Sequence, residues 1–140
     1  MRNTSKTLSS LVVGLIAWMA LAALGNLALR IGVPGYALVE PAMQFSSMML
    51  CMRLLVGVAA TLTAGMLAGY LDRSGNAGLL LGALFVLLFG ANHVYLWTEF
   101  PVWFHLTFLA YLLPATVAGA NVGKQMRRQR HACRQPSQRA

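Results

Sequence analysis

The chain is organised as four long apolar runs separated by short polar segments. The runs extend over about residues 8–30, 48–71, 78–98 and 102–122, and a basic tail follows at 123–140. An α-helix rises about 1.5 Å per residue, so about 20 residues cross the hydrocarbon core of a membrane. Each run reaches that length. The pattern therefore predicts an all-α, integral membrane four-helix bundle that forms one transmembrane domain over residues 1–140.

The segments between the runs contain residues that favour turns or break helices. Residues 32–47, GVPGYALVEPAMQFSS, hold two prolines, two glycines and Glu40, and they are predicted to form the longest loop. Residues 72–76, DRSGN, are typical of a compact turn, and residues 98–101, TEFP, leave a very short connection. Pro114 lies inside the fourth run. It predicts a kink rather than a break, because neighbouring helices can satisfy the freed carbonyl.

The first run has a second interpretation as a cleaved signal peptide. Arg2 and Lys6 would form its basic region, and Ala20-Leu21-Ala22 resembles a cleavage site with small residues. However, the apolar run continues for several residues beyond that site. We therefore expect an uncleaved first helix.

The composition agrees with a membrane protein and argues against a soluble domain. Hydrophobic residues make up 58% of the chain and charged residues only 10%, against about 25% charged in soluble domains. The net charge of +8 could suit a nucleic-acid partner, but six of the eleven basic residues lie in the last seventeen positions. A basic tail after an apolar run first indicates topology, and it also suits anionic lipids, so we expect no nucleic acid. These six residues are Lys124, Arg127, Arg128, Arg130, Arg134 and Arg139.

The distribution of charge predicts the orientation. With the N-terminus inside, nine basic residues lie on the cytoplasmic side (Arg2, Lys6, Arg73 and the six of the tail), and only Arg30 and Arg53 lie outside. Positive residues stay on the cytoplasmic side of membrane proteins, so both ends are expected in the cytoplasm. Aromatic rings then gather at the outer boundary, where such rings prefer to lie. They belong to Tyr95, Trp97, Phe100, Trp103 and Phe104.

Small residues recur at helical spacing in the second and fourth runs. Because lipid tails are as apolar as leucine, helices in a membrane associate through close backbone approach at such residues. The second run carries the ladder Gly57, Thr61, Gly65 and Gly69, and the fourth carries Ala115 and Gly119. These residues are predicted to form a packing face. Its partner could be a helix of the same chain, a second copy or another membrane subunit.

Five polar side chains are predicted to lie at one depth, in the outer third of the membrane. They are Arg53, Asn92, His93, Glu99 and His105. Polar groups are costly there, so the set is a candidate functional cluster, with separate contacts to headgroups as the alternative. Arg53 is expected either to reach the headgroups or to pair with Glu99 or Glu40. Asn92 and Glu99 share a helical face, so Glu99 is expected to turn inward.

His93 and His105 flank the short connection at similar depths. They could hydrogen-bond to each other, share a metal ion or bind a haem. The sulfur-rich stretch Met43, Met48, Met49, Cys51 and Met52 would suit copper(I), although methionine also simply fills apolar space. Cys51 and Cys133 match no metal spacing. The chain carries no phosphate loop, paired carboxylates or activated nucleophile, so we expect neither an enzyme nor a cofactor.

In length and number of helices the chain resembles the small multidrug-resistance transporters. That family depends on a glutamate in its first helix, and this first run has no acidic residue, so proton-coupled exchange is not expected. The segment Gly90–Tyr111 resembles small uncharacterised bacterial inner-membrane proteins of four helices. We therefore expect a multi-pass protein of the cell inner membrane that acts as a helix-packing accessory or scaffold. The alternatives are a small oligomeric transporter or channel, and a protein that binds metal or haem.

Overall fold

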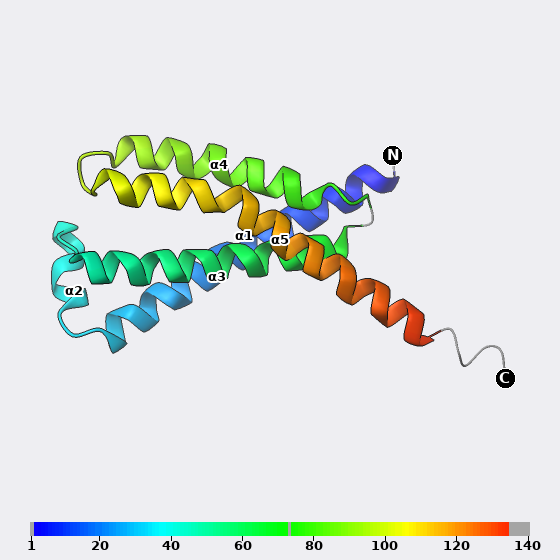
Figure 1. The fold of residues 1–140 in the computed structure, drawn as a ribbon, viewed down its shortest axis with the longest axis horizontal. Helices are drawn as coiled ribbons and strands as arrows, with labels where there is room; N and C mark the ends of the chain where they lie inside the picture. Colours follow the sequence, from blue (N-terminus) through cyan, green and yellow to red (C-terminus); the bar gives the residue numbers. More distant parts are fainter. Residues whose placement is uncertain (1, 73, 135–140) are drawn as a thin grey trace.

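The computed structural model of the chain describes residues 2–72 and 74–134, and this part contains helices and no strand (Figure 1). Four of the helices are long and apolar enough to cross a membrane, which confirms the all-helical prediction. Arg73 and Arg139, used above to predict the orientation, lie outside the described residues. The elements in chain order are α1 (Arg2–Gly32), α2 (Tyr36–Val39), the 3-10 helix η1 (Glu40–Ala42), α3 (Ser47–Leu71), α4 (Ala77–Tyr95) and α5 (Val102–Arg134).

Three helices differ from their expected limits, and the first of them, α1, begins at Arg2 rather than near residue 8. Helix α4 ends at Tyr95 instead of residue 98, and α5 continues through most of the basic tail to Arg134. Pro114 lies inside α5 without interrupting it, and Figure 1 shows that α5 bends near its middle. The freed carbonyl and the clash of the proline ring account for a bend without a break.

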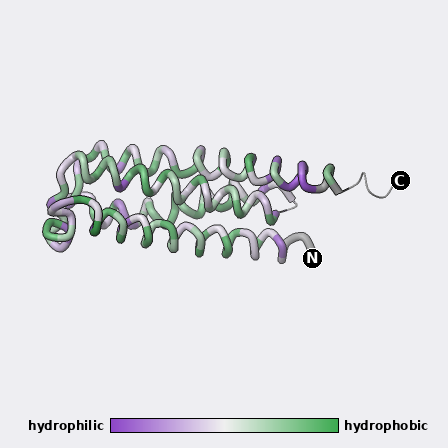
Figure 2. The backbone as a smooth tube through the Cα atoms, turned by 90° about the horizontal axis from the view of Figure 1, so that it is seen from below, coloured by the Kyte–Doolittle hydropathy of each residue, from purple (hydrophilic) through white to green (hydrophobic). Residues whose placement is uncertain are grey.

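The bundle has two distinct ends. The α2–η1 segment and the α4–α5 connection lie at one end, which we call the loop end. The beginning of α1, the end of α5 and the α3–α4 turn lie at the other, the terminal end (Figure 1). Figure 2 shows hydrophobic residues along the length of the long helices, with hydrophilic residues concentrated in the last part of α5. Strongly hydrophilic residues are therefore few along the middle of the long helices.

The ladder of small residues packs inside the chain, between α3 and α5. A Cβ added to Gly65 would overlap the backbone of Thr116, and one added to Gly69 would overlap the backbone of Ala120. Gly119 of α5 approaches the backbone of α3 in the same way. Backbones this close need residues without side chains, which explains the spacing. The partner left open by the sequence is therefore a helix of the same chain.

Three members of the predicted packing face have other environments. Gly57 lies against the ring of Tyr111 rather than a backbone. The hydroxyl of Thr61 donates to the Gly57 carbonyl at 2.7 Å and accepts the indole N–H of Trp18 at 3.0 Å, so it links α3 to α1. Ala115 is only partly buried. The close backbone contact between α3 and α5 is thus concentrated at Gly65 and Gly69, the two glycines of the ladder nearest the terminal end.

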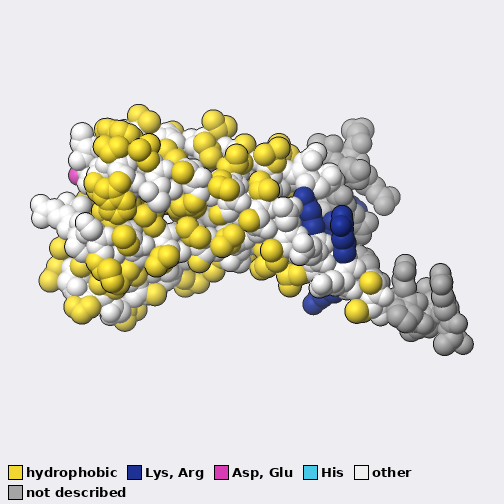
Figure 3. Space-filling view, viewed as in Figure 1, with side chains coloured by type: hydrophobic (Ala, Val, Ile, Leu, Met, Phe, Trp, Pro, Cys, Tyr) yellow, Lys and Arg dark blue, Asp and Glu magenta, His cyan; other side chains and the backbone are white. Residues whose placement is uncertain are grey.

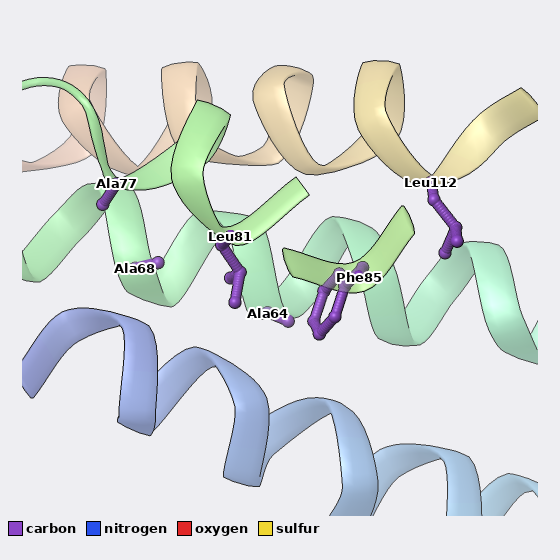
Figure 4. Close-up of a cluster of buried hydrophobic side chains, with 6 residues drawn as sticks. All are labelled: Ala64, Ala68, Ala77, Leu81, Phe85 and Leu112. Atoms are coloured by element: carbon purple, nitrogen blue, oxygen red, sulfur yellow. The ribbon is translucent and has the colours of Figure 1, made fainter. Parts of the chain in front are cut away.

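A compact apolar core fills the bundle from the terminal end to its middle. Leu81 and Phe85 of α4 are fully buried, and they point toward small residues of α3 (Figure 4). Gly14 brings α1 onto the same cluster, because its position is in contact with Leu81, Ala64 and Ala68. Large side chains of one helix fill the space above small side chains of the next, so this half of the bundle is closely packed.

A buried carboxylate joins three helices at the terminal end. Asp72, only 1% exposed, accepts backbone N–H bonds from Ser74, Gly75 and Ala77 at 2.9–3.1 Å. The hydroxyl of Thr7, on α1, donates to the same carboxylate at 3.0 Å. Burial alone would raise the pKa of Asp72, but these hydrogen bonds outweigh it and lower the pKa to about 2. We call this arrangement the Asp72 junction.

Basic residues of α5 cap the end of α3. Arg127 donates to the carbonyls of Tyr70, at 3.1 Å, and of Asp72, while Lys124 donates to the Gly75 carbonyl at 2.7 Å. The last carbonyls of a helix have no partner within the helix, and cations stabilise them. On the face seen in Figure 3, the Lys and Arg side chains gather at this end, and hydrophobic side chains are spread over the rest of the helices.

Candidate functional site

A cavity of about 310 Å³ lies between all four long helices in the loop-end half of the bundle. Its volume is at the lower end of the range of small-molecule sites, roughly 300–1,000 Å³. The lining is mostly apolar and aromatic, with a few polar groups. It consists of Trp18, Ala22, Ala23, Asn26, Leu29, Arg53, Val56, Gly57, Phe89, Asn92, His93, Leu96, Phe100, Phe104 and Phe108.

The cavity opens on the side of the bundle. Only two of its lining residues are exposed, Ala23 on α1 and Asn92 on α4. Helices α1 and α4 make few contacts with each other, whereas α1 packs mainly on α3. The opening therefore lies between α1 and α4, about one helical turn from the loop end of α4. A molecule would reach the cavity from beside the helices rather than along their axis.

Aromatic rings form the floor of the cavity. The rings of Trp18 and Phe89 lie 4.3 Å apart, and Phe89 also contacts Phe85 and Phe108 at 5.8 and 5.6 Å between centroids. The only polar atom of the Trp18 ring is bonded to Thr61, so it presents no polar group to the cavity. The packed core begins beyond these rings, on the side of the terminal end. The cavity is consequently closed toward the terminal end.

Arg53 supplies the positive charge of the cavity wall. Its Nη1 donates to the Tyr36 hydroxyl at 2.9 Å, and its guanidinium lies 4.7 Å from the centre of the Phe45 ring. Tyr36 is fully buried, and burial raises the pKa of its hydroxyl. That hydroxyl donates in turn to Asn26 Oδ1 at 2.8 Å. The α2 segment thus links Arg53 on α3 to α1.

The network continues from Asn26 to an ion pair. Asn26 Nδ2 donates to Glu40 Oε1 at 3.0 Å, and Arg30 binds the other oxygen of Glu40. The hydrogen bond from Arg30, together with that from Asn26, holds the pKa of Glu40 below its ordinary value. This network contains two arginines and one carboxylate. Its net charge is therefore +1, and the charge left without a carboxylate partner is that of Arg53.

The expected inward position of Glu99 is wrong. Among the described residues the one ion pair is that of Arg30 with Glu40, so Arg53 pairs with neither glutamate. Glu99 is exposed. The physical reason is that α4 ends at Tyr95, so the helical spacing that placed Glu99 on one face with Asn92 no longer applies.

His93 of α4 and His105 of α5 contact each other beside the cavity. Their Nδ1 atoms lie 2.6 Å apart, and both side chains are buried. His105 Nε2 lies 3.2 Å from the Phe100 carbonyl, which can only accept a hydrogen bond. The Nε2–H of His105 therefore donates to Phe100, and His93 donates its Nδ1–H to His105. This bond holds both rings in place, with His93 at the cavity and His105 behind it.

The histidine geometry favours a hydrogen bond over a shared metal ion. Two imidazole nitrogens on one tetrahedral zinc ion would lie about 3.3 Å apart, from metal–nitrogen distances of about 2.0–2.1 Å. The observed separation is shorter. Across the described residues, no three His, Cys, Asp or Glu side chains gather in a group that could hold a metal ion. Cys51, central to the sulfur-rich stretch, is free and exposed.

The structure divides the predicted polar cluster. Arg53, Asn92 and His93 share the cavity, His105 supports His93, and Glu99 lies apart. The sequence did not reveal the role of Tyr36, the residue that joins Arg53 to α1. Its signals were weak: a lone tyrosine after a glycine, in a segment without helical periodicity.

Comparison with known proteins adds no assignment. No family model, curated protein or solved structure matches the chain.

Proposed function

We propose that this protein is a non-enzymatic, four-span membrane protein that binds a small amphipathic molecule in the cavity at its loop end. The observation that carries the proposal is the lining itself, in which aromatic walls meet the polar groups of Arg53, Asn92 and His93. A largely apolar pocket with a few convergent polar groups is the usual form of a small-molecule site. The opening between α1 and α4 suits a molecule that arrives from within a membrane.

The topology belongs to the same proposal. We place both chain ends in the cytoplasm of a bacterium and the helices in its inner membrane, because nine basic residues against two favour that orientation. The cavity then lies in the outer half of the membrane. Arg128 and other exposed basic residues of α5 remain available to anionic lipids at the inner surface.

Reporter fusions test the topology. A fusion after Gly75 and one after Ala140 are expected to report a cytoplasmic position, and one at Glu40 an external position, because the spans alternate in direction. Paired reporters that are active on opposite sides of the membrane make the measurement. An external signal at the C-terminus would contradict the four-span proposal.

The geometry supports binding better than the accessory or channel functions expected from the sequence. The small-residue ladder packs against α5 of the same chain, so it offers no free face to another subunit. The core around Leu81 and Phe85 fills the terminal half, so a single chain gives no support for a continuous path. A channel would require an oligomer, with its path between the chains.

Filling the cavity tests the proposed function. Ala22 lines the cavity, whereas Ala20 is exposed on the same helix, so Ala22→Phe and Ala20→Phe form a matched pair. Single-chain amphiphiles at about 100 times their dissociation constant are expected to stabilise the wild type and Ala20→Phe by about 2.7 kcal/mol. The stabilisation should be lost in Ala22→Phe. Thermal unfolding in a neutral detergent measures the effect, and equal stabilisation of all three proteins would count against the cavity.

A further inference from the structure

We infer that the molecule bound in the cavity is a single-chain carboxylate, whose charged group binds Arg53 and whose chain lies against the aromatic walls. This inference rests on the proposed function and names the chemical class of its ligand. It is carried by three independent features of the cavity: its charge, its volume and the direction in which it runs from Arg53 to the Trp18 ring.

The charge of the cavity wall favours an anion. An arginine has five N–H donors, and among the described residues Arg53 makes one hydrogen bond, to the Tyr36 hydroxyl. Glu40, the nearest carboxylate in the network, is already bound by Arg30 and Asn26. A cation beside apolar surface is costly without a counter-charge. One monoanion at Arg53 would neutralise the net charge of +1.

The size of the cavity selects a small anion with one chain. A volume of about 310 Å³ is at the lower end of the range for small-molecule sites, and it favours a ligand with one chain over a ligand with two. A carboxylate occupies less of this volume than a phosphodiester headgroup, and its two oxygens match the planar donors of arginine.

The direction of the cavity suits an apolar chain. From Arg53 to Thr61, which holds Trp18 at the floor, α3 rises by about 12 Å. Over this distance the wall is formed by apolar side chains such as Val56, Phe89 and Phe108. The charged group would lie near the loop end, at the depth of lipid headgroups, and the chain would point toward the membrane centre. This is the orientation that a fatty acid already has in a membrane.

Quenching of Trp18 fluorescence by brominated ligands tests the inference. The protein is placed in nanodiscs of neutral phosphatidylcholine at pH 8, and 10-bromodecanoate is compared with the uncharged 10-bromodecanol. A Trp18→Phe protein measures the background from Trp97 and Trp103. We expect the acid to bind the wild type at least about tenfold more tightly than the alcohol, as for a charge-assisted hydrogen bond.

Substitutions of Arg53 separate the effect of its charge on binding from the effect of its shape. Arg53→Met should abolish the preference for the acid, and Arg53→Lys should retain part of it. Arg128→Met removes the same charge from an exposed site at the terminal end and should change nothing. If Arg53→Met does not fold, the acid-to-alcohol ratio of the wild type and of Arg53→Lys still decides the question.

The outcomes distinguish the two proposals. Equal affinity for the acid and the alcohol, or a preference for the acid that survives Arg53→Met, would overturn the inference that the ligand is an anion. The proposal that the cavity binds an amphipathic molecule would still stand. Tighter binding of 10-bromodecyl phosphate than of the acid, dependent on Arg53, would overturn the carboxylate in favour of a phosphate. Failure of every ligand to quench Trp18 would overturn the proposed function itself.

Discussion

Replacing Gly65 with leucine is expected to destabilise the bundle by roughly 3 kcal/mol, the upper part of the range for overpacked sites. A Cβ at this position would overlap the backbone of Thr116, and a backbone cannot move aside as a flexible side chain can. Either α3 and α5 separate or the helices shift along each other. The loss is measured as a change in the free energy of unfolding in detergent.

Gly90 provides the matched control for this substitution. It lies inside α4, and nothing lies within 4 Å of the position that its Cβ would take. Gly90→Leu adds the same side chain where the Cβ meets open space, and it removes a glycine from a helix interior, so we expect little loss or a small gain. Similar losses at both positions would show that the α3–α5 contact is not the close approach described here.

Replacing Asp72 with alanine is expected to cost roughly 3–5 kcal/mol at neutral pH. The substitution removes the acceptor of three backbone N–H groups and of the Thr7 hydroxyl, and it takes from the buried N–H of Ala77 the acceptor that it has in the folded chain. Asp72→Asn keeps one acceptor oxygen, so its loss should be smaller. Asn76→Ala, an exposed change in the same turn, is the control. A loss of stability no greater than that of Asn76→Ala would contradict the Asp72 junction.

The same carboxylate predicts a dependence of stability on pH. The pKa of Asp72 is lowered on folding, from an ordinary value of 3.8 to about 2. The resulting stabilisation, about 2 kcal/mol, is present above the ordinary pKa and disappears as the pH falls through the folded value. The difference in stability between the wild type and Asp72→Asn should therefore shrink between about pH 4 and pH 2.

The sequence predicted the helices and the ladder because both depend on regular spacing. Four apolar runs give four helices, and residues at four-residue intervals, such as Gly65 and Gly69, must share a face. Regular spacing does not say which helix lies opposite. It also fails where a helix stops, as it did for Glu99, since the expected face existed only if α4 continued past Tyr95.

The cavity could not be predicted, because its apolar lining has the same composition as a lipid-facing surface. Phe89 lines the cavity and Leu87 is 72% exposed, yet both lie in one unbroken apolar run. The basic tail shows a similar ambiguity. Arg127 and Arg128 are neighbours, but only Arg127 caps the carbonyls of α3.

Helix α1 is fastened at two points near its ends. Thr7 binds the Asp72 junction, and Asn26 binds Glu40 beside the α2 segment. The two points are about 28 Å apart along the helix. Hydrogen bonds near both ends of α1 oppose a shift of α1 along its own axis relative to α3. The hydrogen bond from Trp18 to Thr61 also holds the middle of α1 against α3. The mouth of the cavity would therefore widen by a tilt of α4, which makes few contacts with α1, rather than by movement of α1.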